Sequence, residues 1–491
     1  MIDNETGDIA EIVSAKSSGS PSLLKRVSKF FSNIPDGELL TPSEEPAILS
    51  SNVRIARKSG PFMLTLGNVA LEVHPDLPVT GEESNTAQEW IIHTGAAFYE
   101  SVPMFLRIGT NETVLLGRVD DLQTRIFSFD NSVANRHVKI FNRKGELTIQ
   151  PLELELPTRI SSINTSTDVW AVRQKNLLRL PEILGHALAQ FDDEHALGIA
   201  RNVNELLASE AYREPNDKGM PGGIINLPNE MTVVIMGDIH ARVENLLCVI
   251  TEGGLLTALE RGEACLVFLG DLIHGQESGG LENMESSVFI LDLFFMLKRR
   301  FPKNVFYIRG NHESFSPNVG KGGVPQGLLF RKHLEKLRGK EYAAEIEKLF
   351  NGLAFIIQGE GFAACHGAPA RSKVNRETLI NIQRYPGIQS ELVWNRLRQG
   401  IRPAGYVKGS VKKFRKTLNL AKHAPLIVAH TPLSLEDTLW LNVGDIKGHH
   451  IVYSAHTHRV AALAMKNGQV TPLEFIPELA LKFLANQHKA Q

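Results

Sequence analysis

Apolar runs of strand length that lead directly into metal-competent side chains are the strongest pattern in the chain. Residues 233–235, Val-Val-Ile, predict a buried strand that ends at Gly237. Asp238 and His240 follow it, before a helical pattern begins at Val243. Residues two positions apart on an extended backbone point to one face. Asp238 and His240 can therefore bring a carboxylate oxygen and an imidazole nitrogen to one divalent ion.

Four later apolar runs end in the same way. The run 266–269 leads into Asp271, and the run 305–308 leads into Asn311 and His312. The run 362–365 leads into His366, and the run 426–429 leads into His430. In open α/β sheets, ligands bind outside the carboxyl ends of the strands. We therefore expect the side chains at these strand ends to converge on one crevice.

The region before these strands, residues 47–167, has a different periodicity. Short apolar runs alternate with turn signals such as Pro75-Asp76 and Lys144-Gly145. This pattern predicts an all-β domain, a sandwich or a barrel. The expected strands are 63–66, 69–73, 104–108, 114–116, 125–129, 138–141 and 147–149.

Residues 168–215 predict a helical connector between the β-rich domain and the metal-competent strands. Apolar residues recur at helical spacing, and Pro181 stands where one helix should begin or end. The first 46 residues are rich in Ser, Lys, Glu and Pro, which predicts disorder. The resulting division is a disordered segment 1–46, a β-rich domain 47–167, a helical connector 168–215, an α/β domain 216–485 and a tail 486–491.

Composition narrows the class of protein. The chain has 491 residues, of which 43% are hydrophobic and 22% charged, as in a soluble globular protein. A formal net charge of -1 gives no reason to expect nucleic-acid binding. No apolar run approaches the roughly 18 residues that a membrane span needs. Cys248, Cys265 and Cys365 lie in apolar segments, which indicates buried thiols in a reducing compartment, the cytoplasm.

Residues 224–477 resemble the phosphoprotein phosphatase family of metallophosphoesterases. The matching motifs are Gly-Asp-Ile-His at 237–240, Gly-Asp at 270–271, Gly-Asn-His-Glu at 310–313, His-Gly at 366–367, and His430. Each motif alone is common by chance, but all of them in this order at strand ends are specific. The resemblance implies an α/β fold of two packed sheets flanked by helices, with two metal ions at the carboxyl ends of the strands.

The resemblance also implies a ligand set. One ion would be held by Asp238, His240 and Asp271, and the second by Asp271, Asn311, His366 and His430. A shared carboxylate holds two cations about 3.5 to 4 Å apart, where they polarise a phosphoryl group and share the hydroxide that attacks phosphorus in line. Mixed Asp, Asn and His ligands suit manganese, iron or zinc, and we favour manganese.

Further roles follow from the same resemblance. In addition to the shared carboxylate of Asp271, the resemblance assigns a catalytic role to His312, which would donate a proton to the leaving oxygen. Arg402, in register with the family's phosphate-binding arginine, would bind the substrate phosphate together with Asn311. Arg242 either assists in binding that phosphate or faces solvent.

Two groups that the family places beside the metals are altered. Relatives have an Asp three residues after the shared carboxylate, followed by an Arg, and this chain has His274 and Gly275 there. We place His274 and His458 at the rim of the site. Because the carboxylate that supports the proton donor is absent, we expect phosphotyrosine to be hydrolysed at least as well as phosphoserine or phosphothreonine.

A second resemblance lies in the β-rich domain. Gly117-Arg118, residues 132–140 and residues 162–165 resemble the forkhead-associated phosphothreonine-binding domain. That family has a Ser where this chain has Ala134, and Arg118 would still offer a phosphate fork. The alternatives are phosphopeptide binding and a sandwich used for packing or for contact with a protein partner.

The sequence as a whole predicts a metal-dependent phosphoprotein phosphatase acting on phosphorylated proteins. One alternative is a metallophosphoesterase for dinucleoside polyphosphates or phosphodiesters, which the neighbouring His456 and His458 permit. Another is an adaptor whose phosphatase domain is degraded. The extra β-rich domain and the altered second motif also resemble bacterial effector phosphatases of the Wip type, which implies delivery into a host cell.

Overall fold

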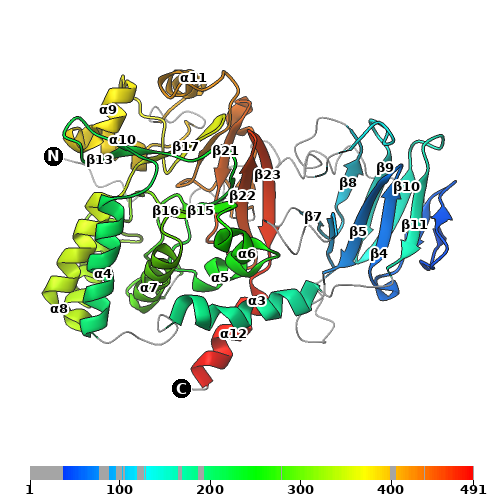
Figure 1. Cartoon of the computed structure of the whole chain (residues 1–491), viewed down its shortest axis with the longest axis horizontal. Coiled ribbons are helices and arrows are strands. Elements are labelled where there is room, and N and C mark those ends of the chain that lie inside the picture. The colour runs from blue at the N-terminus through cyan, green and yellow to red at the C-terminus, as the bar shows by residue number, and fades with distance from the viewer. Residues whose placement is uncertain are drawn as a thin grey trace.

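The computed structural model describes residues 37–76, 88–95, 102, 105–118, 127, 129–163, 169–185, 193–277, 279–398, 405–435 and 437–489. Within these ranges the chain forms an all-β sandwich and a larger α/β body, which lie side by side in Figure 1. The expected fold class, an α/β body of two sheets preceded by an all-β region, is confirmed.

The all-β sandwich is built from two sheets whose apolar faces meet. Phe62, Leu64 and Leu66 alternate along one strand and share a buried core with Ile140 and Leu147 of the facing sheet. The first sheet has the strand order β1 (Glu38–Leu39), β3 (Val53–Ile55), β10 (Glu146–Pro151), β9 (Val138–Arg143), β8 (Thr113–Leu116), and the second has the order β2 (Ala47–Ile48), β11 (Thr158–Ser162), β4 (Phe62–Leu66), β5 (Val69–Pro75), β6 (Trp90–His93), β7 (Phe105–Ile108).

The expected β-strands agree with these elements, with two qualifications. The strand expected at 125–129 falls largely outside the described residues, as do residues 1–36. Residues 37–46, in the segment expected to be disordered, contribute β1, because Glu38 and Leu39 pair in parallel with Val53 and Arg54 of β3.

The helical connector consists of α3 (Val169–Leu184) and α4 (Asp193–Ala208). The expectation of a helix boundary at Pro181 is wrong, because α3 continues through it. A proline removes one backbone hydrogen bond from a helix. Here the neighbouring turns stay helical because Leu177, Leu180 and Leu184 are buried in the core of the α/β body.

The α/β body contains two sheets packed face to face. Val233 and Ile235 point into the core between the sheets, while Val234 and Met236 point into the core beneath the helices. The larger sheet has the order β12 (Arg213–Pro215), β13 (Pro221–Asn226), β17 (Ile356–Gly359), β18 (Phe362–Cys365), β19 (Leu426–Val428), β21 (His449–Val452), β20 (Leu439–Trp440), and the smaller has the order β16 (Val305–Tyr307), β15 (Ala264–Phe268), β14 (Thr232–Met236), β22 (Val460–Lys466), β23 (Gln469–Phe475).

Helices cover the outer face of each sheet. The smaller sheet is covered by α5 (Val243–Thr251), α6 (Leu255–Glu260) and α7 (Glu285–Arg300), with α8 (Gln326–Gly352) and α12 (Glu478–Lys489) packed around them. The larger sheet is covered by α9 (Arg376–Ile380), α10 (Pro386–Trp394) and α11 (Lys408–Thr417). None of the helices in the described ranges combines the length and apolar character that a membrane crossing requires.

The outer face of the β5–β6–β7 sheet is docked on the α/β body. Trp90 and Ile92 of β6 point into the sandwich core, whereas Ile91 of β6 and Phe105 of β7 join the core of the α/β body. The Arg107 guanidinium on β7 donates to the carbonyl of Glu474 on β23 at 3.1 Å. The sandwich and the α/β body therefore share an apolar interface edged with charges.

Arg173 on α3 joins the two bodies through buried ion pairs. Its guanidinium lies 3.1 Å from the Asp76 carboxylate of the sandwich and 2.8 Å from the Glu252 carboxylate of the α/β body. All three side chains are nearly inaccessible to solvent. Breaking a buried pair leaves an uncompensated charge, which costs several kcal/mol.

The substitution Arg173→Met should lower the free energy of unfolding in urea by about 3 kcal/mol or more, because it removes the partner of the buried Glu252 carboxylate and leaves Asp76 paired with Arg107 alone. Arg179→Met, on the same helix, is the matched control. The Arg179 guanidinium pairs with Glu260 at 2.7 Å, but 26% and 30% of these side chains are exposed, so its loss should cost less than about 1 kcal/mol. Equal losses in the two variants would contradict the assigned role of Arg173.

Candidate metal centre

The carboxyl ends of strands from both sheets meet at one edge of the α/β body. Asp238 and Asp271 follow β14 and β15 of the smaller sheet, and His366 and His430 follow β18 and β19 of the larger sheet. The His430 N–H donates to Asp238 Oδ1 at 2.9 Å, and His366 Nδ1 donates to the Leu269 carbonyl at 2.8 Å. These bonds tie the two sheets together at this edge.

The backbone at this edge adopts conformations that are uncommon for residues with a side chain. The φ angle is 48° at His240, 49° at Asp271 and 65° at His430. Such strain persists only where surrounding contacts hold it, and it clusters at functional sites. Here the His240 N–H donates to the Asp271 carbonyl at 2.9 Å. A Cβ on Gly270 would lie 2.4 Å from the Gly310 nitrogen, so these two loops pass too closely for a side chain at position 270.

His240, Asp271 and His312 form a first group of possible metal ligands. One donor atom from each lies within 4.8 Å of the others. His240 Nε2 is 3.9 Å from Asp271 Oδ2 and 3.7 Å from Asp238 Oδ2, and His312 Nε2 is 4.0 Å from Asp271 Oδ2. Asp238, His240 and Asp271, predicted to hold one ion, are thus brought together.

Asp271, His366 and His430 form a second group with the same spacing. His366 Nε2 lies 3.5 Å from Asp271 Oδ2, and the His366 and His430 rings are 5.0 Å apart. Asn311 joins them, with its Oδ1 3.0 Å from His366 Nε2. Asp271 therefore belongs to both groups, as expected of a carboxylate shared by two ions.

The hydrogen bonds of His366 and His430 leave lone pairs facing this space. His366 Nδ1 donates to a carbonyl, and its Nε2 faces Asn311 Oδ1 at 3.0 Å. His430 donates to the Trp394 carbonyl, and its buried Nε2 has no partner among the described residues. Donors about 2.1 Å from one ion at right angles lie about 3 Å apart. The arrangement fits a divalent cation.

The two buried aspartates have pKa values that depart from the ordinary range in opposite directions. Burial, Asp238 and Glu313 together raise the pKa of Asp271 well above its usual value. Burial also acts against the charged form of Asp238, but contacts with His240 and His366 outweigh it and lower its pKa to about 2. A cation between the carboxylates removes the repulsion that raises the pKa of Asp271.

The placement of His274 at the rim is wrong. His274 is fully buried, and its Nδ1 lies 3.0 Å from Nδ1 of His312. Its ring also packs edge-on against Phe330. Burial lowers the pKa of His274 to about 3, so this ring is neutral at ordinary pH. The expected proton donor, His312, is therefore supported by a neutral imidazole.

Of the remaining predicted site residues, the structure describes His458 and Arg242, and neither belongs to the two ligand groups. His458 is exposed, and its N–H donates to His456 Nδ1 at 3.2 Å, so this pair lies on an accessible loop. Arg242 pairs with the carboxylates of Glu244 and Glu277, and its Nη2 also donates to the Thr457 hydroxyl. Arg402 lies outside the described residues.

Two supporting side chains were not assigned a role from the sequence. The buried Glu313 carboxylate accepts from the backbone N–H groups of Asp271, at 2.9 Å, and Gly310, at 2.7 Å, and so holds the two ligand loops together. Its place in the Gly-Asn-His-Glu motif was the available signal. The Gln276 amide contacts His240 Nε2, and no local sequence pattern predicts this contact.

A comparison with protein families matches residues 231–460 to the calcineurin-like phosphoesterase model. A similar curated protein is the serine/threonine-protein phosphatase PP2A-like PPG1 of Candida albicans, 30% identical over 241 residues that cover 46% of this chain and 50% of that protein. The serine/threonine-protein phosphatase rdgC of Drosophila melanogaster is 23% identical over 266 residues, 51% of this chain and 34% of that protein.

A solved structure with a similar fold is a protein serine/threonine phosphatase from Saccharomyces cerevisiae, with a TM-score of 0.46 and 16% identity over 62% of this chain and 96% of that one. The chain spans half or less of the length of the two curated relatives. The resemblance stated from the sequence motifs is confirmed: residues 231–460 match the calcineurin-like phosphoesterase model, and the two similar curated proteins are named serine/threonine-protein phosphatases.

Proposed function

We propose that the chain is a metal-dependent phosphoprotein phosphatase that hydrolyses phosphomonoesters on proteins. The observation that carries this proposal is the position of Asp271, which belongs to two groups of buried donors at once. Two divalent ions in such a site polarise the phosphoryl oxygens and supply a nucleophile at neutral pH. The family match over residues 231–460 supports the same chemistry.

The residues of the chain then have distinct tasks. Asp238, His240 and Asp271 hold one ion, and Asp271, Asn311, His366 and His430 hold the other, with manganese favoured over iron or zinc. The Asn311 amide also faces the phosphate. His312 Nε2, 4.0 Å from Asp271 Oδ2, donates a proton to the leaving oxygen. Arg402 binds the phosphate.

Arg242 binds the substrate phosphate in this scheme only after its ion pair with Glu277 opens. It can reach a phosphate only by leaving Glu277, whose side chain is 65% exposed, since that carboxylate competes for the same guanidinium. A phosphorylated peptide with its own negative charges would favour that exchange.

The substrate preference that we propose is for phosphotyrosine at least as much as for phosphoserine. A carboxylate beside His312 would stabilise the protonated, positively charged imidazole, and neutral His274 does so less well. Phosphoserine releases an alkoxide about as basic as hydroxide, whose parent acid has a pKa of about 15.7. Phosphotyrosine releases a phenolate, the base of an acid with a pKa of about 10. Weak proton donation therefore penalises phosphotyrosine less.

The β-rich domain is proposed to contact a protein partner. Its Arg118 Nη1 donates to Asn131 Oδ1 at 2.8 Å, so phosphate binding there requires this contact to open. The buried thiols of Cys248, Cys265 and Cys365 favour action in a reducing compartment such as the cytoplasm. Delivery into a host cell stays a prediction from the resemblance to effectors.

Metal content tests the dinuclear centre. Purified wild-type protein should retain two manganese ions in this centre, and Asp271→Asn should lose both, because the shared negative ligand becomes a neutral amide. His458→Gln, on the exposed loop, should keep both. Elemental analysis after dialysis against manganese measures the ratio, and an Asp271→Asn variant with undiminished manganese would contradict the assignment.

Activity on p-nitrophenyl phosphate and on matched phosphopeptides tests the function. Chelation should abolish hydrolysis and added manganese should restore it, whereas the phosphodiester bis-p-nitrophenyl phosphate should be a poor substrate. A metal-loaded protein that hydrolyses none of these monoesters would support the adaptor alternative. Preferential hydrolysis of the diester would support the phosphodiesterase alternative.

The substitution His274→Asp tests the proposed reason for the substrate preference. Restoring a carboxylate beside His312 should raise kcat on a phosphoserine peptide by about tenfold or more, within the range of general acid catalysis. The same change should alter kcat on the matched phosphotyrosine peptide much less. His458→Asp is the control for adding a carboxylate outside the ligand groups. Equal effects of His274→Asp on both peptides would overturn the argument.

A further inference from the structure

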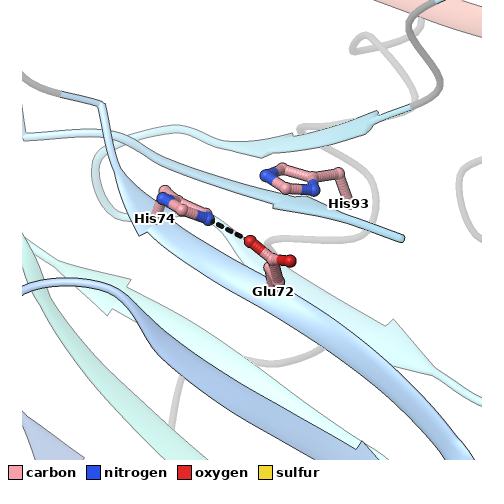
Figure 2. A group of neighbouring side chains, drawn as sticks. All are labelled: Glu72, His74 and His93. Carbon is pink, nitrogen blue, oxygen red and sulfur yellow. Dashed lines mark hydrogen bonds and ion pairs between the residues drawn. The ribbon is translucent and has the colours of Figure 1, made fainter. Parts of the chain in front are cut away.

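A second cluster of metal-competent side chains lies in the all-β sandwich, outside the phosphoesterase domain. Glu72 and His74 are two positions apart on β5, and His93 on β6 is paired directly opposite Glu72. All three side chains therefore point to one face of the sheet. Figure 2 shows the two imidazole rings and the carboxylate turned toward one another above the strands.

The three side chains are close enough to share one ion. One donor atom from each lies within 4.8 Å of the others. His74 Nε2 is 2.9 Å from Glu72 Oε2, and the rings of His74 and His93 are stacked with centroids 4.7 Å apart. Gly95, with a φ of 69°, borders the cluster, and a Cβ there would lie 2.7 Å from Glu72 Oε1. The glycine leaves the carboxylate room to turn.

The cluster offers a cation one carboxylate and two imidazoles. Glu72 is a carboxylate whose pKa is lowered first by its hydrogen bond to His74, while burial acts in the opposite direction. Burial, followed by the neighbouring His74 and by the Arg173 charge, lowers the pKa of His93 to about 3. Arg107 and Arg173 of the same interface both pair with Asp76.

We propose that Glu72, His74 and His93 bind one divalent transition-metal ion, with zinc the best match to two imidazole nitrogens and one carboxylate oxygen. The Gly95 N–H donates to His93 Nδ1 at 3.0 Å, and this hydrogen bond would break when Nδ1 binds the ion. Water would complete the coordination. The ion is separate from the pair held by Asp271, because every protein ligand comes from β5 and β6.

The position of the cluster points to a structural task. The face that carries it also carries Ile91 and Phe105, which pack into the core of the α/β body. An ion that joins β5 to β6 would fix the strands on which this docking depends. Binding of zinc should therefore stabilise the junction between the two bodies.

The test compares bound zinc in the full chain and in three single variants, Glu72→Gln, His74→Gln and His93→Gln. After chelation and dialysis against zinc, wild-type protein should carry one equivalent more than each variant, and the affinity for that equivalent should fall by about tenfold or more. His137→Gln, which alters a buried histidine of the same sandwich, is the control and should keep the ion. Zinc should raise the Tm of wild type more than that of the three variants.

The outcomes distinguish this site from the catalytic centre. Asp271→Asn should keep the additional equivalent, so failure of the dinuclear assignment leaves this test intact. Equal zinc content in wild type and in the three variants would overturn the proposal. If the variants do not fold, zinc-soaked crystals of the wild type decide: an anomalous peak between Glu72 and His93 supports the site, and its absence at that place refutes it.

Discussion

The burial of Asp271 beside Asp238 and Glu313 is the constraint on which the α/β body depends. Buried carboxylates repel one another unless a cation or a proton lies between them. Burial and this repulsion raise the pKa of Asp271. Strained backbone at His240, Asp271 and His430 brings the donors together, and the Glu313 carboxylate holds the loops in place through backbone N–H groups. A buried site with these donors and this repulsion is a candidate site for metal ions.

The surroundings of His312 differ from the pattern implied by the resemblance, while all the predicted ligand positions are filled. His274 reaches His312 where a carboxylate would otherwise stand, and the contact between the rings is short and buried. The ligand geometry does not depend on this contact, because His366 and His430 are oriented by backbone carbonyls instead. Under the proposed roles, a change at position 274 would act on proton donation by His312 and leave the orientation of these two ligands intact.

The sandwich is attached to the phosphoesterase domain by more than a linker. Ile91 and Phe105 enter the core of the larger body, and Arg173 bridges carboxylates of both bodies. The Glu72, His74 and His93 cluster lies on the same docked face. An unpaired buried charge destabilises the protein, so these ion pairs favour the one docked arrangement in which each charge has its partner. The β-rich part is thus positioned relative to the candidate metal centre.

The sequence by itself determined the elements whose signal is local. An apolar run followed by Asp238 and His240, or by Asp271, marks a strand end regardless of what lies beyond, because side-chain alternation is a property of the extended backbone. Six strands of the sandwich, β4, β5, β7, β8, β9 and β10, were predicted for the same reason, whereas β1, β2, β3, β6 and β11 were not among the expected strands. Only the tertiary structure decided that α3 continues through Pro181, that His274 is buried against His312, and that Glu72 faces His93. These outcomes depend on packing and on strand register between distant segments, and no local pattern encodes either.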